Sequence, residues 1–234
     1  MKNPSKYNLL PGLSQESLKL LACVTMLLDH IGAIFFPGSV LRIIGRVSFP
    51  IFCFLLAEGF FHTRNKRRYA LRLAVSMLLA EIPFDLAFFR RIYWGHQNVM
   101  LTLLLGYLAI WAVTEAGSAM AKALFAAAFA VAAEYLHSDY GGTGVLLILV
   151  FALTREAQGR NWIRGFLMLV LFAEMSSAAI VRAGGFVITR QMLGAAAMLP
   201  IALYSGEKKT SSKAVQLAFY LFYPVHLAAL WLLA

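Results

Sequence analysis

The sequence predicts an all-α fold, a polytopic integral membrane bundle of about nine transmembrane helices in a single domain that covers residues 1–234. The chain is 61% hydrophobic and 14% charged, with a mean hydropathy of +0.73. A water-exposed globule of this composition would leave most of its apolar surface unburied. In addition, apolar runs of about 17 to 25 residues, long enough to cross a bilayer, recur along the whole chain. We therefore expect a multi-pass protein in contact with membrane lipid.

The apolar windows define the expected spans in chain order. They are 18–36, 40–61, 69–89, 98–115, 119–137, 143–154, 165–181, 187–204 and 214–233. Eight or ten spans remain alternatives, because 143–154 is short and Arg190 and Gln191 interrupt 187–204. No repeat or soluble-domain linker is evident, so function is expected to lie in the polar residues of the spans.

Connector charge predicts the orientation. With a cytoplasmic N-terminus, three strongly basic connectors all fall inside, as the positive-inside rule requires: 62–69, 155–164 and 206–213. The connectors 36–39 and 138–144 contain no lysine or arginine and fall outside, whereas the basic connector 89–98 is an exception. The net charge of +10 is therefore interpreted as a topology signal, and no nucleic-acid partner is expected.

The N-terminus and the cysteines carry no further signal. The first 17 residues contain no apolar core of a signal peptide, so the first span is expected to stay in the protein. Cys23 and Cys53 both lie inside apolar runs, where they are interpreted as packing residues. Neither a disulfide nor a metal site is expected.

The first span keeps a cation, a carboxylate and an imidazole within the stretch "LKLLACVTMLLDHIG". Lys19 lies near the cytoplasmic boundary, and Asp29 and His30 lie about 15 to 18 Å further along the helix. Eleven residues at 100° each place Lys19 and His30 within about 20° of one helix face. That face could line a passage or form a close helix contact, and the spacing does not decide between them.

Other ionisable residues fall at a similar outer depth. Arg42 and Arg46 stand one turn apart in the second span, Glu81 and Asp85 four residues apart in the third, and His226 beyond the middle of the last. A structural ion pair is one interpretation of the arginines and carboxylates. Two histidines and several opposite charges at one depth favour a substrate path, a proton relay or a reaction site.

Six blocks in order along the chain resemble successive blocks of the TraX family, whose named member acetylates the N-terminus of conjugative pilin. They are "LKLLACVTMLLDHIGAIFFP", "LRIIGRVSFPIFCFLLAEGFFHTRNKRRYALRL", "EIPFDLAF", "QNVMLTLLLGYLAI", "DYGGTGVLLIL" and "FYLFYPVHL". The resemblance implies a bacterial plasma (inner) membrane protein. Nothing in the blocks identifies the acceptor.

A more distant resemblance concerns the first two spans. The eleven-residue spacing of Lys19 and His30 is similar to the opening motif of two membrane acyltransferase families, acyltransferase-3 with Arg and His and heparan glucosaminide acetyltransferase with Asn and His. "RIIGRVSFPIF" resembles the acyltransferase-3 block in which two arginines precede a proline. Lys19 stands where acyltransferase-3 proteins have arginine.

These resemblances imply a membrane-embedded acyltransferase that uses acyl-CoA, with acetyl-CoA as the expected donor. The acceptor would be an amine or hydroxyl of a pilin-like peptide, glycan or lipid at the outer side. Arg42 and Arg46 are expected to hold the acceptor or the outer carboxylates Glu81 and Asp85. The cations expected to hold the CoA phosphates are Lys19, Arg64, Lys66, Arg67 and Arg68.

His30 is the expected general base. Asp29 is a further catalytic candidate, but it lies about 100° away around the helix, so its pairing with His30 does not follow from adjacency. Glu81, Asp85 or His226 would then orient the imidazole. The alternatives are a small transporter or flippase that uses the same ionisable cluster, and a non-catalytic scaffold. Turnover of acetyl-CoA would distinguish the enzyme from both.

Overall fold

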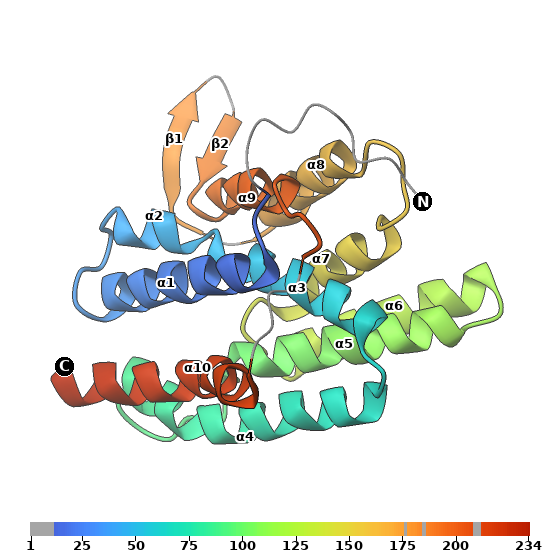
Figure 1. Cartoon of the computed structure of the whole chain (residues 1–234). Coiled ribbons are helices and arrows are strands. Elements are labelled where there is room, and N and C mark those ends of the chain that lie inside the picture. The colour runs from blue at the N-terminus through green and yellow to red at the C-terminus, as the bar shows by residue number, and fades with distance from the viewer. Residues whose placement is uncertain (1–11, 176, 184–185, 208–211) are drawn as a thin grey trace.

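The computed structural model describes residues 12–175, 177–183, 186–207 and 212–234. Its described part is a helical bundle with one short hairpin (Figure 1). The elements in chain order are α1 (Gln15–Ile34), α2 (Leu41–Gly45), α3 (Ser48–His62), α4 (Lys66–Phe89), α5 (Val99–Glu115), α6 (Ala119–Tyr135), α7 (Gly141–Leu153), α8 (Arg160–Ala173), β1 (Ala179–Ala183), β2 (Phe186–Thr189), the 3₁₀ helix η1 (Gln191–Ala197), α9 (Met198–Ala202) and α10 (Lys213–Leu233).

Three helices are long and apolar enough to cross a bilayer: Gln15–Ile34, Leu41–His62, which joins α2 and α3, and Ala214–Leu233. Large apolar side chains are also exposed on the flanks of other helices, including Leu78 of α4 and Val131 of α6. Exposed apolar side chains in this number are typical of a protein that contacts lipid. These features agree with the predicted helical membrane fold, while the number of spans stays a prediction.

The prediction was wrong for the segment between α8 and η1. The expected spans 165–181 and 187–204 give way there to an antiparallel hairpin in which Val181 pairs with Ile188. The segment is rich in β-branched residues on both sides of a Gly-Gly pair in the sequence, which is a hairpin signal. Its overall apolarity is also that of a membrane span, so apolarity alone does not distinguish the two structures.

The connectors gather at two opposite ends of the bundle. At one end, Lys66 lies 3.3 Å from Glu115, and Arg155 lies 3.3 Å from Glu58. The backbone of Leu13 also pairs there with that of Tyr204. We call this the inner end, because it holds the connectors predicted to be cytoplasmic.

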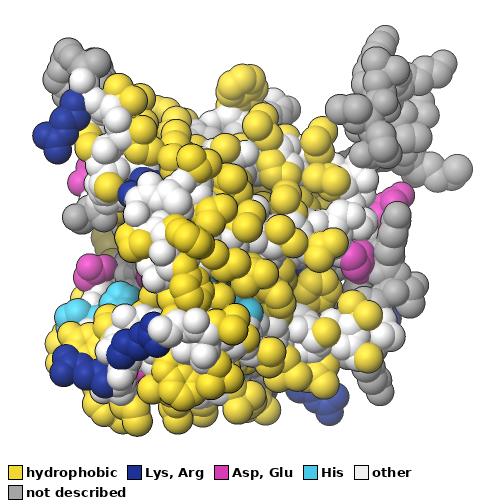
Figure 2. Space-filling view, turned by 90° about the vertical axis from the view of Figure 1, so that its left-hand side faces the viewer, with side chains coloured by type: hydrophobic (Ala, Val, Ile, Leu, Met, Phe, Trp, Pro, Cys, Tyr) yellow, Lys and Arg dark blue, Asp and Glu magenta, His cyan; other side chains and the backbone are white. Residues whose placement is uncertain are grey.

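The opposite end, here called the outer end, holds the connectors 35–40, 90–98 and 136–140. Gln97 pairs there with Ser138 through the backbone, and His96 lies 3.7 Å from Asp139. Figure 2 views this end of the molecule, where hydrophobic side chains dominate and histidine side chains are visible among them. From 35–40 to 155–164, the connectors alternate between the two ends as the sequence predicted.

Helix α3 lies at the centre of the bundle. Ten of its 15 residues are buried, including Cys53, and it packs against α1, α5, α7 and η1. By contrast, α1 and α10 are each buried on part of their surface only. The part of α1 that is not buried includes a polar face, and this face lines an internal cavity.

Candidate functional site

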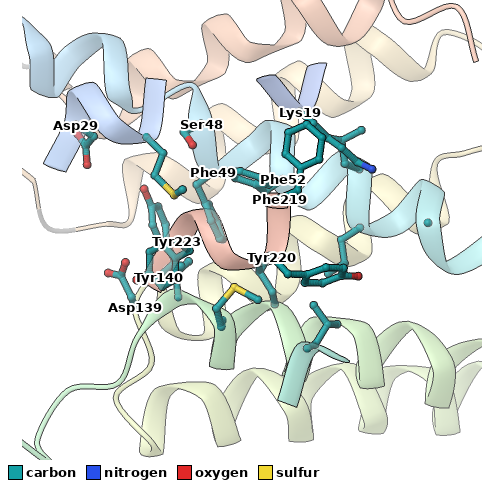
Figure 3. A pocket seen from close by; sticks show the side chains of 18 of the residues that line it. Lys19, Asp29, Ser48, Phe49, Phe52, Asp139, Tyr140, Phe219, Tyr220 and Tyr223 are labelled. Atoms are coloured by element: carbon teal, nitrogen blue, oxygen red, sulfur yellow. The ribbon is translucent and has the colours of Figure 1, made fainter. Parts of the chain in front are cut away.

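A cavity of about 660 Å³ extends between the inner and outer ends, lined mainly by α1, α3, α4 and α10. Its volume falls within the roughly 300 to 1,000 Å³ of typical small-molecule sites. Figure 3 shows Lys19 and Asp29 at opposite ends of this space, with the aromatic side chains of Phe49, Phe52 and Tyr220 between them. The cavity therefore has polar ends and an aromatic middle.

One face of α1 forms a wall of this cavity. Gln15, Lys19, Met26 and His30 all line it. These residues recur at the spacing of a single helix face. Of the two arrangements that the sequence left open for this face, the structure has the one that lines a passage.

His30 lies in direct contact with His226 of α10. The distance from His30 Nδ1 to His226 Nε2 is 2.7 Å, and the two rings are stacked with centroids 5.0 Å apart. His226 Nδ1 lies 2.6 Å from the carbonyl oxygen of Phe222. The last span thus supplies the partner that orients the His30 ring.

These two contacts fix the proton positions of a neutral pair. A carbonyl oxygen only accepts, so His226 Nδ1 carries a hydrogen and donates it to Phe222. His226 Nε2 then has a lone pair and accepts from His30 Nδ1. As a result, the remaining ring nitrogen of His30, Nε2, has its lone pair available, which is the form required of a general base.

Aromatic side chains hold the histidine pair in place. Phe88 of α4 meets the His30 ring edge to face at 5.3 Å, and Phe222 stacks on His226 at 4.8 Å. His30 lines the cavity, whereas His226 is 7% exposed and lies behind it. His30 can therefore touch a substrate in the cavity, and His226 acts on it only through His30.

The carboxylate of Asp29 is the ion-pair partner of both arginines. Arg42 Nη1 lies 2.7 Å from Asp29 Oδ2, and Arg46 Nη2 contacts the same oxygen. The expected pairing of these arginines with Glu81 or Asp85 is wrong. Those carboxylates contact Tyr93 and Asn98 instead, whereas α1 and α2 are packed side by side.

Close packing explains why Asp29 and α2 meet. A Cβ added to Gly45 would collide with the side chain of Asp29, and one added to Gly32 would lie 3.0 Å from Leu41 Cβ. The two glycines therefore permit an approach of α1 and α2 that a larger residue would block. At that separation both guanidinium groups reach Asp29.

Arg46 also connects the ion pair to two residues that the sequence analysis missed. Its Nη1 donates to Tyr140 Oη at 3.3 Å and to Gln191 Oε1 at 3.1 Å. The Tyr140 ring stacks on Phe49 at 3.7 Å. The sequence presents Gln191 only as an interruption of a span, although a polar residue in an apolar window is itself a signal of a buried partner.

Glu81 and Asp85 organise the outer connector 90–98. Asp85 Oδ2 accepts the backbone N–H of Tyr93 at 2.8 Å, and Glu81 Oε2 contacts the side-chain amide of Asn98 at the start of α5. Neither carboxylate is among the described residues that line the cavity. A catalytic role for them stays a prediction. The contacts described above give both carboxylates a structural role in holding the connector.

The cations predicted to bind the donor do not all line the cavity. Among the described lining residues, Lys19 is the one member of that set, and its ammonium lies 5.4 Å from the Phe219 ring centroid. Lys66 is held by Glu115 and lies 4.6 Å from the Phe60 ring centroid. The remaining members, Arg64, Arg67 and Arg68, are exposed at the inner end.

Arg72 is a cavity cation that the sequence analysis missed. Its Nε donates to Tyr220 Oη at 3.2 Å, and its guanidinium lies 5.1 Å from the Tyr69 ring centroid. All three residues line the cavity. Arg72 was overlooked because it falls inside the predicted third span and outside the basic connector.

The comparisons with known proteins agree with this architecture. A family model described as TraX protein matches residues 14–234. The chain is 33% identical to a probable fimbrial assembly protein, FimC of serogroup H1, from Dichelobacter nodosus, across 93% of this chain and 94% of the relative. It is 44% identical to an uncharacterized protein of Rickettsia prowazekii over 54 residues, which cover 23% of this chain and 22% of that protein.

No solved structure matches the chain significantly. The match to the family model extends from just before α1 to the last residue, so it includes both histidines and both arginines of the site. This chain belongs to the TraX family.

Proposed function

We propose that this protein is a membrane-embedded acyltransferase. It moves an acyl group, with acetyl as the first candidate, from cytosolic acyl-CoA to an amine or hydroxyl acceptor at the outer side of the membrane. The observation that carries the proposal is the cavity that joins Lys19 at its inner part to His30 at its outer part. A thioester arm that enters from the inner end would meet the imidazole inside this cavity.

The proposed chemistry uses the free lone pair of His30. The acceptor nitrogen or oxygen attacks the thioester carbonyl carbon, and His30 Nε2 takes the proton that the acceptor loses. The carbon–sulfur bond then breaks, and the proton passes to the CoA thiolate, so that free CoA and the acylated acceptor are formed. His226 is a positioning residue, because it holds His30 in the tautomer with Nε2 available.

Arg42 and Arg46 supply positive charge next to His30 at the outer end. Both line the cavity, and Asp29 neutralises only part of their combined charge. Fixed cationic donors in a site shielded from water stabilise the negative oxygen of a tetrahedral intermediate. Asp29, Arg42 and Arg46 together are here called the Asp29 cluster. In this proposal Asp29 fixes the two arginines and does not itself act as the base.

The family membership suggests the acceptor to test first. The relative from Dichelobacter nodosus is named as a probable fimbrial assembly protein, and the TraX family is linked to pilin acetylation. We propose that the acceptor is the amine of a pilin-like subunit. A glycan or lipid acceptor is the alternative within the same chemistry.

The decisive experiment supplies isotope-labelled acetyl-CoA to the purified protein with an envelope extract or pilin peptide and detects labelled product by mass spectrometry. General-base assistance is worth about 10² to 10⁴ in rate. His30→Ala should lose transfer by that factor and still bind the donor. Lys19→Ala should instead weaken donor binding. Lys122→Ala, which changes an exposed cation that does not line the cavity and was not assigned to the donor site, is the matched control.

Two results would contradict the proposal. The first is a well-folded His30→Ala protein that transfers the label at the parent rate. The second is flux of a substrate across proteoliposomes that requires no acyl donor, which would favour the transporter or flippase. The ionisable residues at both ends of the cavity make that function the second candidate.

The direction of transfer depends on the predicted orientation. Single cysteines in place of Arg67 and Ala234 should differ in reaction with an impermeant thiol reagent, with only the second labelled from outside. The natural Cys23 and Cys53 are buried and should give little background. The reverse labelling pattern would place the Lys19 end of the cavity outside and overturn the proposed donor side.

A further inference from the structure

A second, smaller cavity of about 210 Å³ lies at the inner end, between α3, α8 and the residues that follow α9. It shares Glu58, Tyr204 and Gly206 with the large cavity, so the two spaces adjoin. Its other lining residues include three arginines: Arg155, Arg160 and Arg164. These arginines belong to the basic connector 155–164, which the sequence analysis interpreted only as a topology signal.

The three arginines differ in how their charge is balanced. Arg155 lies 3.3 Å from Glu58 and 2.9 Å from Glu156, so its charge is neutralised within the protein. Arg160 instead donates to the backbone carbonyl of Arg155 at 3.2 Å. In the part of the chain that the structure describes, no carboxylate lies within ion-pair distance of Arg160 or Arg164.

Arg164 is the more unusual of these two, because it is only 3% exposed. Its Nε donates to Thr154 Oγ1 at 2.9 Å, and its Nη2 donates to the carbonyl oxygen of Phe151 at 3.1 Å. The guanidinium also lies 5.7 Å from the Phe54 ring centroid. Neutral acceptors fix its position, and Glu58 of the same cavity, which is already paired with Arg155, attracts it only from beyond ion-pair distance. A buried cation without an ion-pair partner is costly unless an anion binds nearby.

The start of α8 adds to the positive potential of the small cavity. Arg160 and Asn161 are the first two residues of this 14-residue helix, and both line the cavity. Gly159 at the N-cap position has no side chain to accept from the first backbone N–H groups. Helix N-termini favour anions, phosphate in particular.

We propose that the small cavity binds phosphate groups. Within the proposed acyl transfer, on which this assignment rests, they are the phosphates of the acyl-CoA nucleotide, and the pantetheine arm passes Glu58 and Tyr204 into the large cavity. The volume fits this division, because about 210 Å³ is below the roughly 300 to 1,000 Å³ of sites that enclose a whole drug-sized ligand. The donor would therefore occupy both cavities.

The small cavity also supplies arginines for the donor phosphates, which the predicted set does not place in a cavity. Arg64, Arg67 and Arg68 are exposed and do not line either cavity among the described residues. Arg160 and Arg164 line a cavity that adjoins the large one at its inner end. Guanidinium groups bind phosphate oxygens through two parallel hydrogen bonds, which suits them to this task.

The test measures binding of coenzyme A to the purified full-length protein by calorimetry. Arg160→Gln changes an exposed side chain and should fold, and it should weaken binding about tenfold or more, because a charge-assisted hydrogen bond contributes about 1.5 to 3 kcal/mol. Arg164→Gln should weaken binding at least as much if it folds. Lys122→Gln, which changes an exposed cation in the first turn of α6 and outside both cavities, should bind like the parent.

A parallel titration with phosphatidylglycerol micelles distinguishes two sources of phosphate. Loss of lipid binding alone in Arg160→Gln would assign the site to a lipid headgroup, and loss of coenzyme A binding would assign it to the donor. If Arg160→Gln binds both ligands with the parent affinities, the phosphate site is wrong. Binding is measured without turnover, so a parent protein that binds coenzyme A but transfers no acyl group would refute the proposed function and leave this site standing.

Discussion

Replacing Asp29 with asparagine should destabilise the protein markedly. The substitution keeps the shape of the side chain but removes the one carboxylate that both arginines contact. Asp29 is 7% exposed, and the side chains of Arg42 and Arg46 are 22% and 13% exposed, so water compensates little of the loss. Arg46 keeps its contacts with Tyr140 and Gln191, which are neutral.

The magnitude follows from the burial. Removing one partner of a buried ion pair costs about 3 to 5 kcal/mol. Asparagine still offers an oxygen to one guanidinium, so we expect about 3 kcal/mol, at the lower end. For a chain of this size each kcal/mol lowers Tm by about 2 to 4 °C, so Asp29→Asn should melt about 6 to 12 °C below the parent.

The assay is a thermal melt of each variant in the same detergent. Glu115→Gln is the matched control, because it removes the carboxylate of an ion pair whose Glu115 side chain is 65% exposed. Such a surface pair contributes about 0 to 1 kcal/mol, so this variant should lose at most about 4 °C. If Asp29→Asn melts within about 2 °C of Glu115→Gln, the Asp29 cluster does not stabilise the contact between α1 and α2.

Two further predictions concern the packing of α2 and the outer end. Gly45→Ala should lower Tm by several degrees, because the added methyl group collides with the Asp29 side chain, whereas Gly117→Ala, which meets nothing within 4 Å, should not; equal melts would refute the close approach. Interaction with the carboxylate of Asp139 raises the pKa of His96 above its ordinary 6.5. The stabilisation that this pair provides should therefore be complete below pH 6.5 and be lost as the pH rises through the higher pKa of the folded state. A Tm difference between the parent and His96→Gln that does not shrink over that range would contradict it.

The helices that build the site were predictable because their signals are local. An apolar run of the length of a bilayer span needs no knowledge of its neighbours, and the helical period alone placed Lys19 and His30 on one face. The same period separated Asp29 from His30 by about 100°. The structure uses that separation, since Asp29 contacts α2 and His30 contacts α10.

The pairing between helices was not predictable from depth. Glu81, Asp85 and Asp29 all lie at the level of the arginines, and only packing decides which carboxylate reaches them. Gly45 makes that choice, because it lets α2 approach Asp29. The arginines of the small cavity were missed for a related reason. Their charge explained the topology, so the burial of Arg164 within the basic segment could not be seen before the fold was known.

The adjacent residues Asp29 and His30 have different tasks: Asp29 pairs with the arginines of the second span, and His30 presents its imidazole to the cavity. A single polar cluster could not perform both tasks. If Asp29 accepted a hydrogen bond from His30, the arginines would lose their counter-charge, and the imidazole would be tied to a structural ion pair. Instead His226 orients His30 from another helix, and its Nδ1 contact with the Phe222 carbonyl leaves its Nε2 to accept. The Asp29 cluster fixes the position of α1 against α2, and that position determines where His30 enters the cavity. Loss of activity in an Asp29 variant therefore identifies a chemical role only if the variant melts like the parent.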